Sequence, residues 1–342
     1  MKKSILAVSA ILFLLVAAIG GTVAFRWYTD NRKANVRRST VIYVHPGDSF
    51  DKVVKNIVDS ASVANRKSLE RTLEKKQTAK YMQPGRYELK PGQTSVFIAR
   101  MLNNCWQSPV RLVLSGTMRN KAAIAKKIAN QMMVDSATVY AALNDDALLA
   151  NYGFNSKNVF SLIIPDTYEM YWTATVEELL QKQKDAYDAF WTADRIAKAE
   201  KQNLSREEVS ILASIVNGET NHEPEMPSIA GVYLNRLRIG MKLQADPTVA
   251  YCLDYSVNRI LNKHLEIDSP YNTYKYEGLP PGPISVPTKA CLDAVLNPDR
   301  HGYLYFCASA AFDGTHKFAV TFPEHLRNAR EFQSALNARA KK

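Results

Sequence analysis

ILASIVNGET, residues Ile211–Thr220, is the stretch around which we interpret the chain, because it places an acid at the end of an apolar helix face. Ser205 and Glu208 match a capping box, which predicts that a helix begins there. Apolar residues and then Glu219 recur at steps of three and four along one face of this helix. Burial and the nearby helix C-terminus both disfavour a charged carboxylate, so we expect a raised pKa for Glu219, which suits a general acid. A Glu on the solvated flank of the helix fits the same periodicity.

The length and charge of the chain limit its class only broadly. A chain of 342 residues is long enough to bury a full core and to divide into two or more domains. With 46% hydrophobic and 23% charged residues, the composition is that of a folded protein. The net charge of +11 predicts attraction to polyanions, which include nucleic acid, anionic lipid and charged cell-wall polymers.

An uncharged apolar run near the N-terminus predicts a single membrane-spanning helix over residues 5–25. A cleaved signal peptide has a shorter apolar core, whereas this run continues into Arg26-Trp27-Tyr28, a typical interfacial anchor. We therefore predict an uncleaved anchor, preceded by a cytoplasmic tail over residues 1–4 and followed by a linker over residues 26–38.

Basic residues on both sides of this run bear on its orientation. Lys2 and Lys3 favour a cytoplasmic N-terminus, although the basic residues after the run favour the opposite. Because only a few residues precede the span, we expect the rest of the chain to be exported. The predicted location is the cytoplasmic (inner) membrane, single-pass, with the body of the protein on the extracytoplasmic side.

The patterns after the linker predict an α+β protein. Residues 39–106 read as strand, helix, helix and strand, the last strand lying in PGRYELKPG, Pro84–Gly92, between two Pro-Gly turns. This order predicts a small subdomain of LysM-like organisation, although any small α+β unit gives it. Residues 107–342 continue with mixed helices and strands, including a strand at Val110–Leu114 and a buried strand at Tyr303–Ala308, and we predict a catalytic domain there. Tyr271–Pro287 is the least core-like segment and reads as a rigid functional loop.

Several kinds of chemistry lack their usual motifs. The sequence contains no His-Glu-x-x-His, no phosphate-binding Gly-x-x-x-x-Gly-Lys-Ser/Thr and no Gly-x-Ser-x-Gly. Its cysteines, Cys105, Cys252, Cys291 and Cys307, form no Cys-x-x-Cys pair and are expected to be mostly buried small hydrophobic residues. We therefore predict no metal site and no cofactor. An exported body also makes nucleic acid an improbable partner, so none is predicted.

A single acid beside a polar and aromatic loop fits cleavage of a polysaccharide. Ordinary glycosidases use two carboxylates, and Glu223, Glu225 and Asp246 are the nearby candidates for the second. None of the three has a spacing that specifies this role.

Four segments, ILASIVNGET, AGVYLNRLRIGMKLQADPTVAY, YNTYKYEGLPPGPISVP and YLYFCASAAFDGTHKF, resemble in order and spacing the signature blocks of the YceG-like (MltG) family of endolytic murein transglycosylases. The resemblance covers roughly residues 162–322. PGRYELKPG is also similar to the family's LysM-like subdomain and PDTYEMYW to its Pro-Asp-Thr-Tyr block, and an N-terminal single-span anchor is the family's usual arrangement.

The resemblance implies a membrane-anchored lytic transglycosylase that cuts within nascent peptidoglycan strands. Glu219 would protonate the oxygen between N-acetylmuramic acid (MurNAc) and N-acetylglucosamine (GlcNAc), then act as base while the muramoyl C6 hydroxyl closes a 1,6-anhydro ring. Its implied partners are peptidoglycan glycan strands, the membrane and, as candidates, the peptidoglycan synthases. Substrate-binding or supporting positions are Thr220, Glu225, Asn235, Arg236, Gln244, Asp246, Tyr271, Asn272, Thr273 and Tyr274.

The chain also departs from the family pattern. Asn217-Gly218 stand where the family often has Glu-Lys, and Gly218 is expected to loosen the helix end by about 1 kcal/mol relative to Ala. Further departures are Met226 for Arg, Ala245 for Thr, and Phe160-Ser161 and Ser115-Gly116 for Glu-Gly. They put in doubt any network that would orient the acid through those side chains.

Two other functions remain open from the sequence. A hydrolytic muramidase would use Glu219 with Asp246 or Glu225 and a water molecule. A non-enzymatic, membrane-anchored scaffold would bind glycan through its LysM-like subdomain and would not need Glu219.

Overall fold

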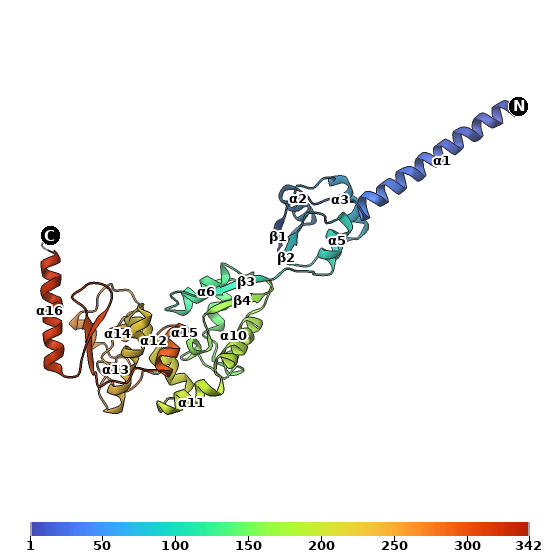
Figure 1. The fold of residues 1–342 in the computed structure, drawn as a ribbon. Coiled ribbons are helices and arrows are strands. Elements are labelled where there is room, and N and C mark those ends of the chain that lie inside the picture. Colours follow the sequence, from blue (N-terminus) through green and yellow to red (C-terminus); the bar gives the residue numbers. More distant parts are fainter. Residues whose placement is uncertain (1, 341–342) are drawn as a thin grey trace. The chain divides into compact units, whose positions relative to one another are not determined.

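A computed structural model describes residues 2–340 of the chain (Figure 1). The fold is mixed α+β, as predicted. In the described part of the chain most elements are helices, and the strands form three two-stranded sheets. The chain divides into two compact units. Unit 1 comprises the residues up to Arg111 together with Glu169–Ala174, and unit 2 comprises Leu112–Tyr168 and the residues from Thr175 onward.

The first helix, α1 (Lys2–Asn31), has the length and apolar composition of a membrane span over Ile5–Asn31. Its large apolar side chains between Ile5 and Phe25 are all exposed. The helix extends beyond Phe25, so the first residues of the predicted linker are helical. The reason is that Thr29 and Asp30 are buried against unit 1, which keeps the last turn of α1 helical.

Unit 1 is built on the antiparallel pair of β1 (Thr40–Val44) and β2 (Gly85–Leu89), in which Ile42 lies opposite Tyr87. Its other elements are α2 (Phe50–Ala61), α3 (Arg66–Lys75), α4 (Thr78–Tyr81) and α5 (Ser95–Asn103). The second of the two predicted helices is divided into α3 and α4, because Gln77 adopts a left-handed conformation between them.

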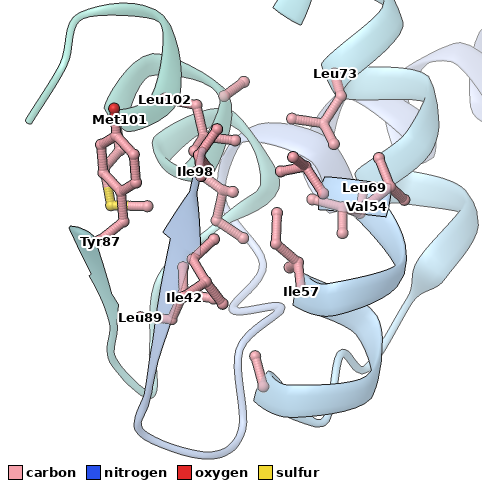
Figure 2. Packing of buried hydrophobic residues seen from close by; sticks show 14 of the residues in the cluster. Ile42, Val54, Ile57, Leu69, Leu73, Tyr87, Leu89, Ile98, Met101 and Leu102 are labelled. Carbon is pink, nitrogen blue, oxygen red and sulfur yellow. The ribbon is translucent and has the colours of Figure 1, made fainter. Parts of the chain in front are cut away.

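One face of this sheet and the helices enclose the core of unit 1, shown in Figure 2. Apolar side chains of both strands point toward α2, α3 and α5, as alternation along a strand requires. The buried side chains labelled in the figure are Ile42, Val54, Ile57, Leu69, Leu73, Tyr87, Leu89, Ile98, Met101 and Leu102.

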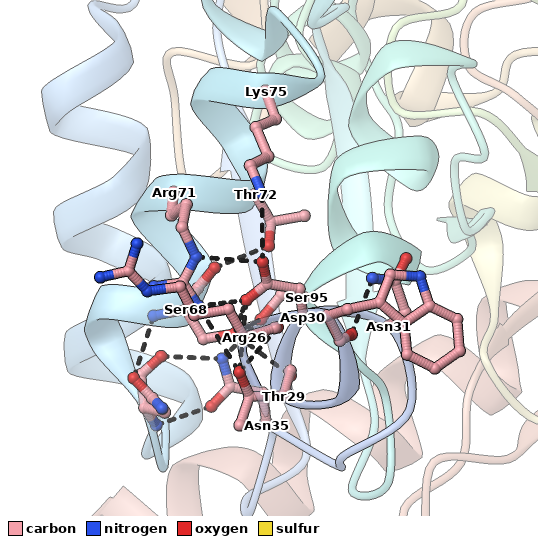
Figure 3. Close-up of polar contacts among 12 residues, drawn as sticks. Arg26, Thr29, Asp30, Asn31, Asn35, Ser68, Arg71, Thr72, Lys75 and Ser95 are labelled. Atoms are coloured by element: carbon pink, nitrogen blue, oxygen red, sulfur yellow. Dashed lines mark hydrogen bonds and ion pairs between the residues drawn. The ribbon is translucent and has the colours of Figure 1, made fainter. Parts of the chain in front are cut away.

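A buried polar cluster, the α1 cluster, joins the end of α1 to unit 1 (Figure 3). The Asp30 carboxylate accepts hydrogen bonds from Ser68 Oγ at 2.8 Å and from Arg71 Nε at 3.0 Å. Asn35, just after the helix, donates from Nδ2 to Ser95 Oγ at 2.8 Å. These bonds satisfy a charge that burial would otherwise strongly disfavour.

Unit 2 is mostly helical. Its elements, two of which cross the unit boundary, are β3 (Val110–Leu114), α6 (Lys121–Ala129), α7 (Ser136–Ala142), α8 (Asp146–Ala150), α9 (Val159–Leu162), β4 (Asp166–Met170), α10 (Val176–Phe190), α11 (Ala193–Lys201), α12 (Arg206–Glu219), η1 (Glu223–Glu225), α13 (Met226–Arg238), α14 (Asp246–Cys252), η2 (Asn262–Glu266), α15 (Lys289–Leu296), β5 (Tyr305–Ala308), β6 (His316–Ala319) and α16 (Phe322–Ala340). The sheets pair β3 with β4 and β5 with β6.

Helix α12 is the central helix of unit 2. Its predicted capping box is present: Ser205 Oγ accepts from the backbone of Glu208, whose carboxylate accepts in return from the backbone of Ser205. The side chains from Val209 to Val216 are all buried, and α12 packs on α13, α14 and α15. This packing fixes where the last residue of the helix, Glu219, must lie.

Two predictions about burial are wrong. The predicted buried strand, β5, is only partly covered, because it has one partner strand and so lies in a two-stranded sheet. Of the cysteines, only Cys291 is buried; Cys105 is exposed, and Cys252 and Cys307 are intermediate.

Candidate active site

Glu219 is the last residue of α12, and its carboxyl group faces inward to α13. Oε1 of this group accepts a hydrogen bond of 2.6 Å from the hydroxyl of Tyr233, a residue of α13 that is 1% exposed. Thr220 ends the helix in an extended conformation, and its hydroxyl accepts from the backbone N–H of His222. The acid is therefore held by a neighbouring helix and by the turn that follows it.

The surroundings of Glu219 raise its pKa to about 7. The main cause is desolvation, since the protein atoms packed around the partly buried side chain displace much of the water that would stabilise its charged form. The Tyr233 hydrogen bond favours the charged form and lowers the pKa in part, whereas the negative charge of Asp246 raises it and the positive charge of Arg236 lowers it. The net result is a carboxylic acid that carries its proton for much of the time near neutral pH.

Two cavities meet at Glu219 and Asn221, which line both. The Asp246 cavity has a volume of about 590 Å³ and is also lined by Asp246, Arg119 and Arg259. The His222 cavity has a volume of about 710 Å³, and its walls come from the turn after α12, from β6 and from α16. Glu219 thus lies between two cavities of unit 2.

Asp246 begins α14 and brings a second carboxylate into the Asp246 cavity. Its Oδ1 accepts a hydrogen bond of 2.6 Å from the hydroxyl of Tyr274. The next residue, Pro247, packs against Gly218 so closely that a Cβ atom on Gly218 would lie 2.5 Å from the Cβ of Pro247. The glycine expected to loosen the helix end is therefore what allows α14 to approach α12.

The loop that supplies Tyr274 supports the turn before Asp246. Thr273 accepts a hydrogen bond from Ala245 N at 3.0 Å through its hydroxyl, and its carbonyl accepts from Gln244 N at 3.1 Å. Asn272 is fully buried and donates to the carbonyls of Leu265 and Ile267. Asn272 and Thr273, both predicted site residues, therefore stabilise the loop. Gln244, a third predicted site residue, is exposed in the turn and has a φ of 49°.

Arg236 and Asn235 of α13 hold the segment that leads into β5. The nearly buried Arg236 guanidinium donates to the carbonyls of Leu304 at 2.7 Å and Leu243 at 2.6 Å. Asn235 donates from Nδ2 to the carbonyls of His301 and Tyr303. Neither side chain lines the two cavities, and Arg236 acts on Glu219 only through its charge.

Glu225 and Tyr271, two further predicted site residues, also line neither cavity. The Glu225 carboxylate accepts from the backbone N–H of His316 at 2.9 Å and lies 3.0 Å from His316 Nδ1, so it ties η1 to β6. Tyr271 packs its ring on Tyr251, with ring centroids 4.6 Å apart. The structure thus brings Glu219, Asp246 and Tyr274 together, places Thr220, Arg236, Asn272 and Thr273 around them, and leaves Glu225 and Tyr271 outside.

Three residues of this site were missed from the sequence: Tyr233, Arg119 and Arg259. In the sequence, Tyr233 is part of the apolar face of its predicted helix. The one signal of a polar partner is that a hydroxyl group stands among aliphatic neighbours. Arg119 and Arg259 lie in segments without a motif. Within residues 2–340, no three His, Cys, Asp or Glu side chains come together in a way that would hold a metal ion.

Comparisons with known proteins agree with this architecture. The profile of the YceG-like family matches residues 42–331, which is most of the chain. A crystal structure of a yceG-like protein from Listeria monocytogenes superposes with a TM-score of 0.56 and 26% identity, over 85% of this chain and 99% of that one.

Two curated relatives are each named endolytic murein transglycosylase. The protein of Bacillus subtilis strain 168 is 32% identical over 232 residues, and the protein of Streptococcus pneumoniae serotype 2 is 30% identical over 181 residues. The matched parts cover 63% and 51% of this chain. They span only 63% and 32% of the length of those relatives.

Proposed function

The chain belongs to the YceG-like family, and from this premise we propose that it is an endolytic lytic transglycosylase of peptidoglycan. It cleaves the bond between MurNAc and GlcNAc within a glycan strand and leaves a 1,6-anhydro-MurNAc end. The names of the curated relatives support the reaction, and the environment of Glu219 is the observation that carries the proposal.

Glu219 has the properties that this reaction requires of one group. A pKa of about 7 leaves the carboxyl group partly protonated at neutral pH, so it can donate a proton and later take one up. Its position between two cavities gives a sugar on each side of the broken bond a place to lie. The hydrogen bond from Tyr233 fixes the orientation of the carboxyl group.

The reaction follows from these properties without a water molecule. Glu219 donates its proton to the glycosidic oxygen as the bond between that oxygen and muramoyl C1 breaks, which releases the GlcNAc side with a free hydroxyl. The muramoyl C6 hydroxyl then bonds to C1, and its proton passes to the Glu219 carboxylate, which restores the acid. Because the attacking oxygen belongs to the same sugar, it gains effective molarity over a water molecule.

The two cavities support an endolytic mode of cleavage. An enzyme that acts on strand ends needs a binding site that is closed on one side of its catalytic acid. Glu219 instead borders two cavities, with volumes of about 590 and 710 Å³. A strand can then continue past the cleaved bond in both directions.

A hydrolytic muramidase is the second candidate, and Asp246 is the observation that favours it. Asp246 lines the same cavity as Glu219 and raises its pKa through negative charge, as the second carboxylate of a glycosidase does. Glu225 is a weaker candidate, because His316 engages its carboxylate.

Product analysis separates the two reactions. Purified full-length protein in detergent is incubated with peptidoglycan, and the new strand ends are identified by mass spectrometry. The proposal expects anhydro-muramoyl ends from the wild type and from Glu223→Gln, whose exposed carboxylate lines neither cavity, but not from Glu219→Gln. Reducing ends would instead establish the hydrolase, and ends that persist in Glu219→Gln would remove this residue from the mechanism.

We also propose that α1 is an uncleaved anchor in the cytoplasmic membrane, with both units on the extracytoplasmic side. Its exposed apolar side chains suit lipid, and the burial of Thr29 and Asp30 in unit 1 makes the end of the helix part of a folded domain. This location would keep the enzyme near the synthases that extend nascent strands. The order β1, α2, α3, α4, β2, in which helices lie between two strands paired antiparallel, supports a LysM-like, glycan-binding unit 1.

A further inference from the structure

The Asp246 cavity contains two arginines that the proposed reaction does not use. Arg119 follows β3, and Arg259 lies in the loop after α14; both are exposed and line the same cavity as Glu219. In the described part of the chain, the arginines that form ion pairs with carboxylates are Arg66, Arg71 and Arg195. Neither cavity arginine therefore has an acidic protein partner within 4 Å.

The position of Arg119 is fixed by an aromatic ring. Its guanidinium lies 5.2 Å from the ring centroid of Tyr255. That ring is held in turn, since the Tyr255 hydroxyl donates to the carbonyl of Ile284 at 2.6 Å. A cation held against the cavity wall costs less side-chain freedom when it binds an anion than a free surface arginine does.

The proposed substrate carries its negative charge in one place. The sugars of a peptidoglycan strand are neutral, and the carboxylates belong to the short peptides attached to the muramoyl residues. Guanidinium groups pair with carboxylates through two parallel hydrogen bonds, which makes arginine well suited to recognise them.

We propose that Arg119 and Arg259 form a carboxylate subsite that binds the peptide of the muramoyl residue seated in the Asp246 cavity. This inference rests on the proposed function, because it assigns the substrate to peptide-bearing strands. The enzyme then cleaves strands whose peptide carboxylates are free in preference to strands in which these carboxylates have been converted to neutral amides.

The experiment compares two substrates with full-length protein in detergent. Uncross-linked strands are used with their peptide carboxylates free and after coupling of these carboxylates to a small amine, which converts them to neutral amides, and kcat/KM for new ends is measured on each. We expect the wild type to prefer the strands with free carboxylates about tenfold or more, because the amidated strands lose hydrogen bonds to a charged group. In Arg119→Ala, Arg259→Ala and the double variant the preference falls toward one, through a higher KM on the strands with free carboxylates alone.

Control variants separate the subsite from general effects. Arg300→Ala removes an exposed arginine from a cavity that lacks Glu219, so it keeps the preference. Arg259→Lys keeps the charge and retains part of the preference. Because Arg119→Ala also loses its contact with Tyr255, Arg259→Ala is the cleaner of the single variants. Equal cleavage of both substrates by the wild type, or an equal loss on both in the variants, would overturn the inference.

Binding distinguishes a failure of this inference from a failure of the proposed reaction. The affinity of Glu219→Gln protein for each kind of strand is measured by co-sedimentation, with and without the arginine substitutions. A preference for strands with free carboxylates that disappears in the double variant supports the subsite even if the wild type forms no new ends. Equal affinity for both kinds of strand refutes it even if cleavage occurs.

Discussion

At the level of single residues, desolvation raises the pKa of Glu219, and its neighbours Tyr233 and Asp246 then change this pKa in opposite directions. Tyr233 donates a hydrogen bond to the carboxylate and so lowers the pKa from the value that burial alone would give. Asp246 adds negative charge and raises it. The acid works in its protonated form, so activity should decline as the pH rises through about 7.

This opposition predicts opposite changes in the pH profile. Tyr233→Phe removes a bond that favours the charged form, so the pKa of Glu219 rises and the decline in kcat/KM moves to higher pH. Asp246→Asn removes a repelling charge, so the pKa falls and the decline moves to lower pH. We expect displacements of about one pH unit, since that corresponds to about 1.4 kcal/mol. If both variants lose activity with the decline unmoved, the two residues have structural roles only.

The sequence predicted the acid but not its full environment. A three- and four-residue periodicity places Glu219 at the end of a buried face, because that pattern depends only on the geometry of one helix. Tyr233 lies on another helix, and its contact with Glu219 follows from how α12 and α13 pack, which no local pattern encodes. Asn272 was predicted to lie near the site, yet its amide group donates its hydrogen bonds to backbone carbonyls of its own loop.

At the scale of secondary structure elements, the approach of α14 to α12 is what places Asp246 beside Glu219. This approach depends on Gly218, which faces Pro247 without room for a side chain. From the sequence, Gly218 was expected only to loosen the helix end, since the contact partner lies on a different element.

Gly218→Ala should therefore lower both stability and activity. The added methyl group forces α12 and α14 apart, at a cost of about 1–3 kcal/mol, and the better helix propensity of Ala offsets at most about 1 kcal/mol of it. Gly302→Ala is the matched control, because no atom lies within 4 Å of the added Cβ. Thermal unfolding and turnover are measured for both variants. A Gly218→Ala protein with wild-type stability and activity would show that α14 does not need this approach.

The assignment of segments to the two units could be predicted only in part. Helix caps and turns mark the elements of unit 1, because these signals are local; Ser49, Asn65 and Thr94 each cap a helix there. Glu169–Ala174 also belongs to unit 1, where the ring of Trp172 lies 4.9 Å from that of Tyr43. No local sequence pattern predicts a contact between residues so far apart in the chain.

At the scale of the whole molecule, the α1 cluster makes the proposed anchor continuous with unit 1. Asp30 is 3% exposed, and its carboxylate is held by Ser68, by Arg71 and, more distantly, by Lys75 at 3.8 Å. At 1.5 Å per residue, Asp30 lies about 8 Å along the helix beyond Phe25, where the apolar run ends. Unit 1 is therefore held close to the surface of the bilayer that α1 is proposed to span.

Asp30→Ala should destabilise unit 1 by about 3–5 kcal/mol, because it leaves the Arg71 guanidinium without its buried partner. Lys75→Ala is the matched control and should cost less than about 1 kcal/mol, since Lys75 is mostly exposed and its ion pair is long. Urea unfolding of the full chain in detergent, followed by tryptophan fluorescence, suits this test because three of the four tryptophans, Trp27, Trp106 and Trp172, belong to unit 1, and the fourth, Trp191, belongs to unit 2. Equal unfolding midpoints for the two variants would mean that the end of α1 is not part of the folded unit 1. In that case a cleaved signal sequence and an uncleaved anchor would explain the apolar helix equally well.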